Sequence, residues 1–256
     1  MSRAFSLALP LLACVGLVAC APLRATTAAG PGGPSGALPL DVLAVTTVDA
    51  ETQNPRYRIH VRWPAAPNAR IYEVIRRFEG GQASVKATLQ APGWVDDALG
   101  AGQGAAYKVN ALAGDSKVLT VTDEKAITVL REEVPAPTGL VPVDGAVLGV
   151  DEVPTLSWDR VEGAAWYHVR VWRASDDQVI YAALTSSTSV KLGDRSPLLL
   201  EKFPDVLPVE GEGSLQRGVV HRWTVSAVRT TGGQDPARVT AIDHRPSKVH
   251  RFSPGG

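Results

Sequence analysis

Alternation of apolar and polar residues constrains the fold of this chain more than any other feature. The segment 56–63, RYRIHVRW, places Tyr, Ile, Val and Trp on one face and Arg or His on the other. This period of two is typical of a β-strand with one buried face. Weaker versions follow at 71–78, 106–113, 126–130, 166–172, 179–184 and 223–228. Short strands separated by turns must stack two sheets to bury their apolar faces, so the sequence predicts an all-β fold.

The strand pattern occurs twice. Trp63 is followed nine residues later by Tyr72, and Trp158 is followed nine residues later by Tyr167. Further along, YKVNALA at 107–113 aligns with HRWTVSA at 221–227. In this alignment the second copy is about 19 residues longer, and we assign the extra residues to an insertion near 193–218. The duplication predicts two related modules.

This pattern resembles fibronectin type III domains, in which a Trp and a Tyr pack in the core and strand F ends Tyr-x-φ-x-φ-x-Ala. The segments 137–140 (PTGL) and 155–158 (TLSW) look especially like that family. In the first copy, 95–99 (VDDAL) before Tyr107 resembles the family's E–F corner, whereas the alignment puts His221 where the second copy should have its corner Tyr. The resemblance implies two tandem antiparallel β-sandwiches of the fibronectin type III/immunoglobulin-like class.

The N-terminus resembles the signal of a bacterial lipoprotein. A basic start precedes an uncharged apolar run at 5–19, which is too short for a comfortable membrane span and ends in the lipobox-like sequence LVAC. The resemblance implies cleavage after residues 1–19 and acylation of Cys20, with palmitate among its acyl chains. An ordinary secretory signal with an incidental Cys is the alternative. Residues 20–38 then comprise the lipidated Cys and a flexible tether, because they are rich in Ala, Gly, Pro and Thr and lack any hydrophobic period.

The predicted organisation and location follow from these two resemblances. The first fibronectin type III-like domain is expected at 39–131, a linker at 132–137, and the second domain at 138–253. Ala21 rather than Asp follows Cys20, so by resemblance the protein lacks the inner-membrane retention signal. We expect a lipid-anchored protein of the bacterial cell envelope, at the outer membrane or cell surface rather than the inner membrane.

Composition excludes several classes of function. The 26 Lys and Arg are balanced by 26 Asp and Glu, which argues against a nucleic-acid partner. Two Cys cannot form a Cys₄ zinc site, and the five His show no spacing suited to a metal. The sequence has no G-x-S-x-G, P-loop or G-x-G-x-x-G motif. We therefore expect no catalytic residues, no bound metal and no cofactor.

The segment 166–172 holds the candidate ligand-binding residues. If Tyr167 and its alternate neighbours point inward, the other face of the strand points outward. The candidate residues are that outward row and one further tryptophan: Trp166, His168, Arg170, Trp172 and Trp94. Exposed Trp side chains could stack on sugar rings or anchor a protein. The alternative is that this face packs beneath the 193–218 insertion.

The function expected from these features is that of a non-catalytic, membrane-anchored envelope lipoprotein. Its two sandwich modules would bind or scaffold a protein or polysaccharide partner, and the insertion is the expected place for a specific interface if it packs between the modules. One alternative is a carbohydrate-binding accessory protein that uses exposed Trp residues. A less favoured alternative is a hydrolase of unrecognised type, which would need a perturbed acid or His pair in a pocket.

Overall fold

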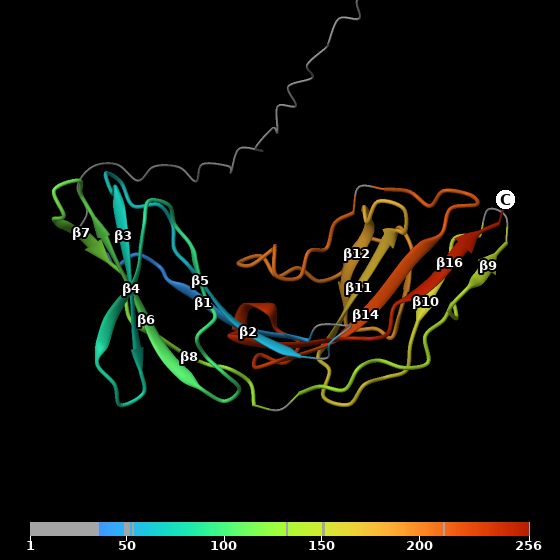
Figure 1. Cartoon of the computed structure of the whole chain (residues 1–256), viewed down its shortest axis with the longest axis horizontal. Helices are drawn as coiled ribbons and strands as arrows, with labels where there is room; N and C mark the ends of the chain where they lie inside the picture. The colour runs from blue at the N-terminus through green and yellow to red at the C-terminus, as the bar shows by residue number, and fades with distance from the viewer. Residues whose placement is uncertain are drawn as a thin grey trace, which may run out of the picture. The chain divides into compact units, whose positions relative to one another are not determined.

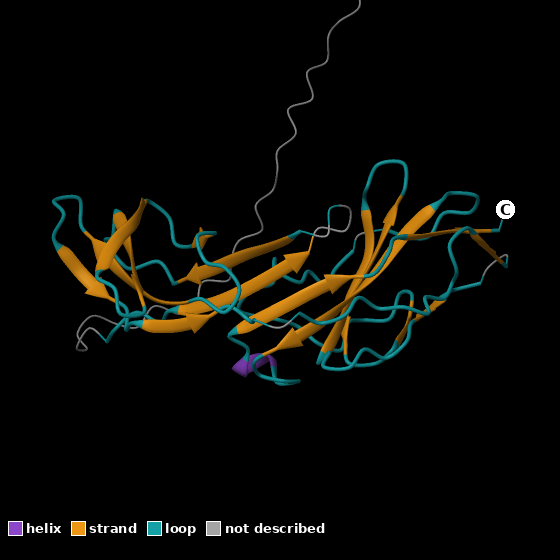
Figure 2. Ribbon diagram, turned by 60° about the horizontal axis from the view of Figure 1, so that its bottom comes forward, coloured by secondary structure: helices purple, strands orange, loops and turns teal. Residues whose placement is uncertain are grey.

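The computed structural model of the chain describes residues 36–255, except for 49–51, 53, 132, 150, 151 and 212. The expected signal peptide, Cys20 and most of the expected tether lie outside the described residues. Residues Gly36–Gly256 form one compact unit. Its elements are strands, apart from a single 3₁₀ turn at Pro236–Arg238 within the described part (Figures 1 and 2). In that part of the chain, no helix has the length and apolar character needed to cross a membrane.

The first half forms an antiparallel sandwich around one core. One layer contains three strands, β1 (Asp41–Val48), β2 (Pro55–Arg62) and β5 (Trp94–Asp96). The facing sheet contains five, β4 (Ala83–Leu89), β3 (Ile71–Phe78), β6 (Gly104–Leu112), β7 (Val118–Val121) and β8 (Lys125–Thr128). Between them, the rings of Trp63 and Tyr72 lie 5.6 Å apart, and the Tyr72 hydroxyl accepts a hydrogen bond from Ala66 N at 2.9 Å.

The second half repeats this arrangement. Its small sheet pairs β10 (Thr155–Ser157) with β13 (Ser189–Lys191). The larger layer contains β12 (Val179–Thr185), β11 (Trp166–Arg173), β14 (His221–Thr230), β15 (Ala241–Pro246), β16 (His250–Pro254) and β9 (Ala146–Leu148). Trp158 and Tyr167 pack at 5.3 Å, and the Tyr167 hydroxyl accepts from Val161 N at 2.8 Å. The same Trp–Tyr contact and the same backbone-to-hydroxyl bond therefore occur in both halves.

The predicted all-β fold of antiparallel sandwiches is confirmed. In the first half the chain places β1 and β2 in one layer, β3 and β4 in the other, β5 in the first again and β6 to β8 in the second, which is the connectivity of fibronectin type III-like and immunoglobulin-like sandwiches. The sequence did not predict that the two halves share a sheet. β1 pairs in parallel with β15, from Ala44 opposite Ala241 to Thr47 opposite His244. A nine-stranded sheet consequently contains strands of both sandwiches.

The strand register corrects one feature of the sequence alignment. Ala111 lies opposite Tyr72, and Ala227 lies opposite Tyr167, so Trp223 occupies the position equivalent to Tyr107. The alignment of His221 with the corner Tyr was wrong by two residues. The error arose because the first copy has Ala at both 111 and 113, and a shift of two residues preserves strand alternation.

The expected corner is present in the first sandwich. The Tyr107 hydroxyl donates to Asp96 Oδ2 at 2.8 Å, and Arg76 Nη1 donates to the same oxygen at 2.5 Å. Asp96 Oδ1 accepts from Ala98 N at 3.0 Å, which closes the turn. Desolvation and the neighbouring Asp96 raise the pKa of Tyr107, so its hydroxyl stays protonated and remains a donor.

Candidate functional site

The insertion, residues 193–218, lies over the place where strands of the two sandwiches meet. Three of its apolar side chains, Leu200, Phe203 and Leu207, are almost completely buried. They belong to a third apolar cluster, separate from the cores of the two sandwiches, which we call the junction cluster. Its buried members are Leu43 and Val45 of β1, Trp166 of β11, Leu184 of β12, Val228 of β14, Ile242 of β15, and these three residues. The insertion therefore covers apolar surface contributed by both halves.

Polar contacts join the insertion to the first sandwich. Lys202 Nζ donates to Asp41 Oδ1 at 3.0 Å. Arg62 forms an ion pair with Asp205, and its guanidinium carbon lies 5.1 Å from the centre of the Phe203 ring. Exposed ion pairs of this kind contribute about 1 kcal/mol or less each, so the apolar cluster is the main source of docking energy.

The proposed row of outward residues on β11 is not a ligand-binding surface of the kind expected. Trp166 is fully buried and His168 is 2% exposed, so of the two interpretations the packing beneath the insertion is the one observed, and the exposed surface is not. The row does point away from its own core, but the insertion covers Trp166 and His168, as in the packing alternative. Arg170 is exposed, and Trp172 is half-buried with the Arg222 guanidinium 5.7 Å from its ring centre.

Trp94 is not brought together with these residues. It is half-buried in the first sandwich, where its ring meets Tyr107 at 6.4 Å and packs against that core. The structure therefore does not bring the five candidates together. Trp166 and His168 lie beneath the insertion, Arg170 and Trp172 lie further along β11, and Trp94 lies in the first sandwich.

A pair of histidines, His168 buried and His244 half-buried, lies at the junction of the insertion with the nine-stranded sheet, and sequence reasoning missed it. His168 of β11 and His244 of β15 have ring centres 5.6 Å apart, and His168 Nε2 lies 2.7 Å from the Pro208 carbonyl oxygen. Desolvation lowers the pKa of His168 to about 4 and that of His244 to about 3. Both rings are therefore neutral at pH 7. The two histidines are 76 positions apart in the sequence. Their contact could have been predicted only if residues 241–246, which form β15, had been recognised as a strand.

The histidine pair is not arranged as a metal centre. Among the described residues, no group of three or more His, Cys, Asp or Glu side chains could hold a metal ion. The Pro208 carbonyl pairs with one nitrogen of His168, whereas His168 Nδ1 and His244 Nε2 are buried atoms without a hydrogen-bond partner in the described part of the chain. These observations favour a packing role for the two rings.

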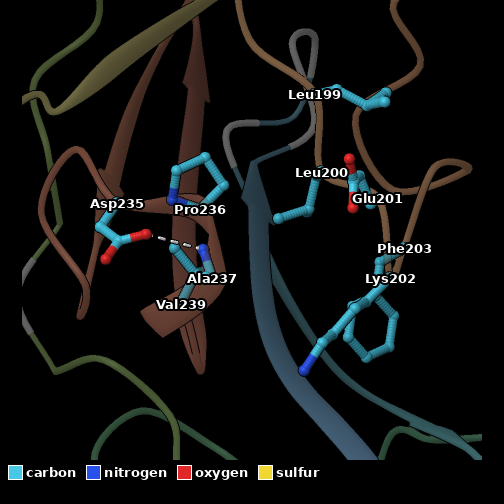
Figure 3. A pocket seen from close by; sticks show the side chains of 9 residues that line it. All are labelled: Leu199, Leu200, Glu201, Lys202, Phe203, Asp235, Pro236, Ala237 and Val239. Carbon is cyan, nitrogen blue, oxygen red and sulfur yellow. Dashed lines mark hydrogen bonds between the residues drawn. The ribbon is translucent and has the colours of Figure 1, made fainter.

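One side of the insertion borders a pocket of about 290 Å³, which we call the turn pocket (Figure 3). Residues 199–203 of the insertion form one wall, and residues 235–239, in the turn between β14 and β15, form the other. Asp235 Oδ1 accepts from Ala237 N at 3.0 Å and so caps the 3₁₀ turn. Leu200, Phe203 and Val239 give the pocket an apolar lining. Glu201, Lys202 and Asp235 are the charged residues of the lining.

A larger pocket, of about 620 Å³, lies on the other side of the insertion against β12, and we call it the edge pocket. Residues 180–182 of β12 line it together with several residues of the insertion. The insertion's lining residues are Gly193, Asp194, Arg195, Ser196, Leu198, Leu199, Val209, Glu210, Gly211 and Gly213. The insertion thus forms walls of two separate pockets, and Leu199 lines both.

Comparison with known proteins finds similarity only among solved structures. No family model and no curated protein matches the chain. A two-domain fibronectin type III segment of chicken tenascin is 15% identical, covers 80% of this chain and 97% of its own, and has a TM-score of 0.26. A cytokine receptor complex is 15% identical over 83% of this chain and 96% of its own, with a TM-score of 0.30.

Pectate lyase Pel3 from Pectobacterium carotovorum is 18% identical, with a TM-score of 0.24. That match covers 43% of this chain and 31% of the lyase. Similarity this low says nothing about what the chain binds or does. The sandwich fold is assigned from the strand pairing described above.

Proposed function

We propose that this protein is a non-catalytic, lipid-anchored component of the bacterial cell envelope, which binds or scaffolds a protein or polysaccharide partner through its insertion. The observation that carries the proposal is the position of the insertion, residues 193–218. It covers the junction cluster with its apolar side chains and also lines both the turn pocket and the edge pocket. Loops held on a rigid sandwich commonly supply the binding surface of such folds.

The chemistry of the two pockets favours binding over catalysis. The turn pocket is lined by apolar side chains and by three charged residues, Glu201, Lys202 and Asp235. The Asp235 carboxylate caps the 3₁₀ turn, and Lys202 donates to Asp41. The titratable pair with strongly lowered pKa values, His168 and His244, lies beneath the insertion and lines neither pocket. Tyr181 does line the edge pocket with a raised pKa, but its hydroxyl stays protonated at pH 7 and so cannot serve there as a general base.

The sequence supports the anchor. Cys20 follows a short uncharged apolar segment and ends a lipobox-like sequence, and Ala21 differs from the inner-membrane retention signal. Acylation of Cys20 would hold the protein to the membrane, since two or more acyl chains give stable attachment. The outer membrane or the cell surface is the expected location.

Crosslinking in intact cells tests the binding proposal. Leu199 is 45% exposed and lines both pockets, so Leu199→Glu should alter the binding surface without unfolding the protein. Val147 is 74% exposed on β9 and lines neither pocket, so Val147→Glu is the matched control. We expect crosslinked species that Leu199→Glu reduces and Val147→Glu retains. Identical crosslinking patterns for all three proteins would contradict a role for the insertion.

Metabolic labelling with a palmitate analogue tests the anchor. Cys20→Ala should abolish labelling and release the protein from the membrane fraction, because no second Cys remains in the chain expected after cleavage. A Cys20→Ala protein that is still labelled and still sediments with membranes would refute this part of the proposal.

The carbohydrate-binding alternative loses its principal support. It required Trp166 and Trp172 to form one exposed stacking surface, but Trp166 is fully buried. Trp172 and Trp94 lie in different sandwiches. We therefore do not propose a function based on an exposed tryptophan row.

A further inference from the structure

Strand β12 is the last strand at one end of the nine-stranded sheet, and its register shows which backbone groups face outward. It pairs with β11 on one side. In the part of the chain that the structure describes, its other side carries one bridge, from Leu184 to Leu198. Leu184 therefore points its N–H and C=O away from β11. In an antiparallel pair the residue two positions along does the same, so Ala182 also directs its N–H and C=O to the outer edge.

The insertion contacts this edge on both sides of Ala182. At Leu184, the Ser196 hydroxyl accepts from the backbone N–H at 2.9 Å and lies 3.0 Å from the carbonyl oxygen, in the place of a paired strand. On the other side, Gly211 lies so close to β12 that a Cβ there would come within 2.4 Å of the Ile180 carbonyl carbon. Between these contacts, the outward groups of Ala182 have no strand partner or loop partner among the described residues.

The edge pocket reaches this gap. Residues 180–182 all line it, and successive side chains of a strand point to opposite faces, so a pocket that touches all three must reach the backbone edge. The Tyr181 hydroxyl is buried and has no hydrogen-bond partner in the described part of the chain. Burial, reinforced by Asp194, raises the pKa of Tyr181 to about 12, so the hydroxyl remains a donor at pH 7. The pocket therefore places a backbone donor and a backbone acceptor of Ala182 beside its lining residues.

We propose that the edge pocket binds an extended peptide segment of the partner, which adds a short strand to β12 at Ala182. One residue of an extended peptide presents a C=O and an N–H on the same side, with the spacing that pairs with Ala182. Ala182 is only 2% exposed, and buried backbone groups without partners cost about as much as a lost hydrogen bond. A peptide that pairs them removes this cost. Its adjacent side chains would meet Leu199 and Val209 of the insertion.

The inference rests on the proposed function, since it identifies the partner as a protein. A polysaccharide is disfavoured by the lining of the edge pocket. Sugar rings are commonly held by stacking on aromatic faces, but the aromatic residue that lines this pocket, Tyr181, has its ring in the core of the second sandwich. The pairing of one donor with one acceptor on a strand edge matches a peptide backbone more closely.

The test selects peptides from a display library of linear random sequences on the full-length chain purified in detergent. The best binder is then synthesised with a single N-methyl group at each backbone position in turn. A peptide that pairs with β12 should lose affinity roughly tenfold or more at the one position whose N–H faces Ala182, and not at the two adjacent positions, whose N–H groups point away from the strand. Loss at every position, or at none, would overturn the proposal.

Protein variants provide the second arm. Ala182→Pro removes the outward N–H while sparing the bonds to β11, an arrangement that edge strands tolerate, and should reduce binding of the selected peptide at least about tenfold. Leu199→Lys should weaken it independently, whereas Val147→Lys on β9 should not. Thermal unfolding of each variant checks the fold.

Two outcomes would contradict the inference that the edge pocket binds a peptide without contradicting the proposed function. The first is the absence of any peptide binder, combined with in-cell crosslinks that still depend on Leu199. The second is binding of a chitin oligosaccharide in place of peptides. Loss of the crosslinks' dependence on the insertion, by contrast, would contradict the proposed function itself.

Discussion

Acidification should destabilise the fold through the two histidines beneath the insertion. His168 and His244 have pKa values lowered to about 4 and about 3, mainly because burial penalises the charged imidazolium. In the unfolded chain both should titrate near the ordinary value of about 6.5. Between pH 6.5 and pH 4, therefore, the unfolded state binds more protons than the folded state. The stabilisation is fully present above about pH 6.5 and is lost as the pH falls toward 4.

The expected magnitude follows from these values. Lowering the pH from 7 to 5 should remove about 2 kcal/mol through His168 alone. His244 acts in the same direction, so the pair together should remove about 2–4 kcal/mol. This is a large part of the 5–15 kcal/mol that is typical of folded domains. Asp243, whose pKa burial raises, acts in the opposite direction as the pH falls.

Urea unfolding followed by tryptophan fluorescence at pH 7, 6 and 5 measures this effect. The double variant His168→Gln, His244→Gln cannot titrate at these positions, so it should lose about 2–4 kcal/mol less than the wild type between pH 7 and 5. His250→Gln, on β16 outside the junction cluster, is the matched control and should follow the wild type. A double variant as acid-sensitive as the wild type would refute the reasoning, whatever its stability at pH 7.

Three further predictions concern packing and polar contacts, each measured by urea unfolding at pH 7. Leu207→Ala should cost about 2–5 kcal/mol and should make the insertion more sensitive to limited proteolysis, because Leu207 is 2% exposed in the junction cluster; unchanged proteolysis would contradict the docking. Tyr107→Phe should cost about 1–3 kcal/mol, because it removes a buried donor to Asp96. Asp205→Ala should cost less than about 1 kcal/mol, because its ion pair with Arg62 is largely exposed.

Strand periodicity predicted which way each side chain of β11 points but not what covers it. Tyr167, Val169 and Val171 lie in the core of the second sandwich, as the alternation indicated. For the opposite face the sequence left two interpretations open, an exposed ligand surface or packing beneath the insertion, and the fully buried Trp166 decides for packing. A period of two assigns residues to faces, and it contains no information about a third layer placed on the outer face. Bulky residues on both faces of 166–172 were the available sign of such a layer.

β1 was not predicted for a related reason. Its sequence, DVLAVTTV, is apolar on both faces, and the sequence reasoning did not recognise it as a strand. Val42 and Ala44 enter the core of the first sandwich, whereas Leu43 and Val45 enter the junction cluster. Strands buried on both faces lose the alternation on which the prediction depended. The sheet shared by the two sandwiches was therefore not predicted, because the strand that joins them, β1, lacks a clear alternation.

The position of the insertion links the stability of the junction to binding. Leu200 and Phe203 belong to the junction cluster and also line the turn pocket. The adjacent residue, Leu199, lines both the turn pocket and the edge pocket. A substitution beneath the insertion, such as one at Leu207, should therefore change the shape of both pockets without touching a ligand. The same coupling applies in reverse, because a ligand that binds only the docked insertion stabilises the docked form by mass action. Binding and resistance to acid should consequently increase together.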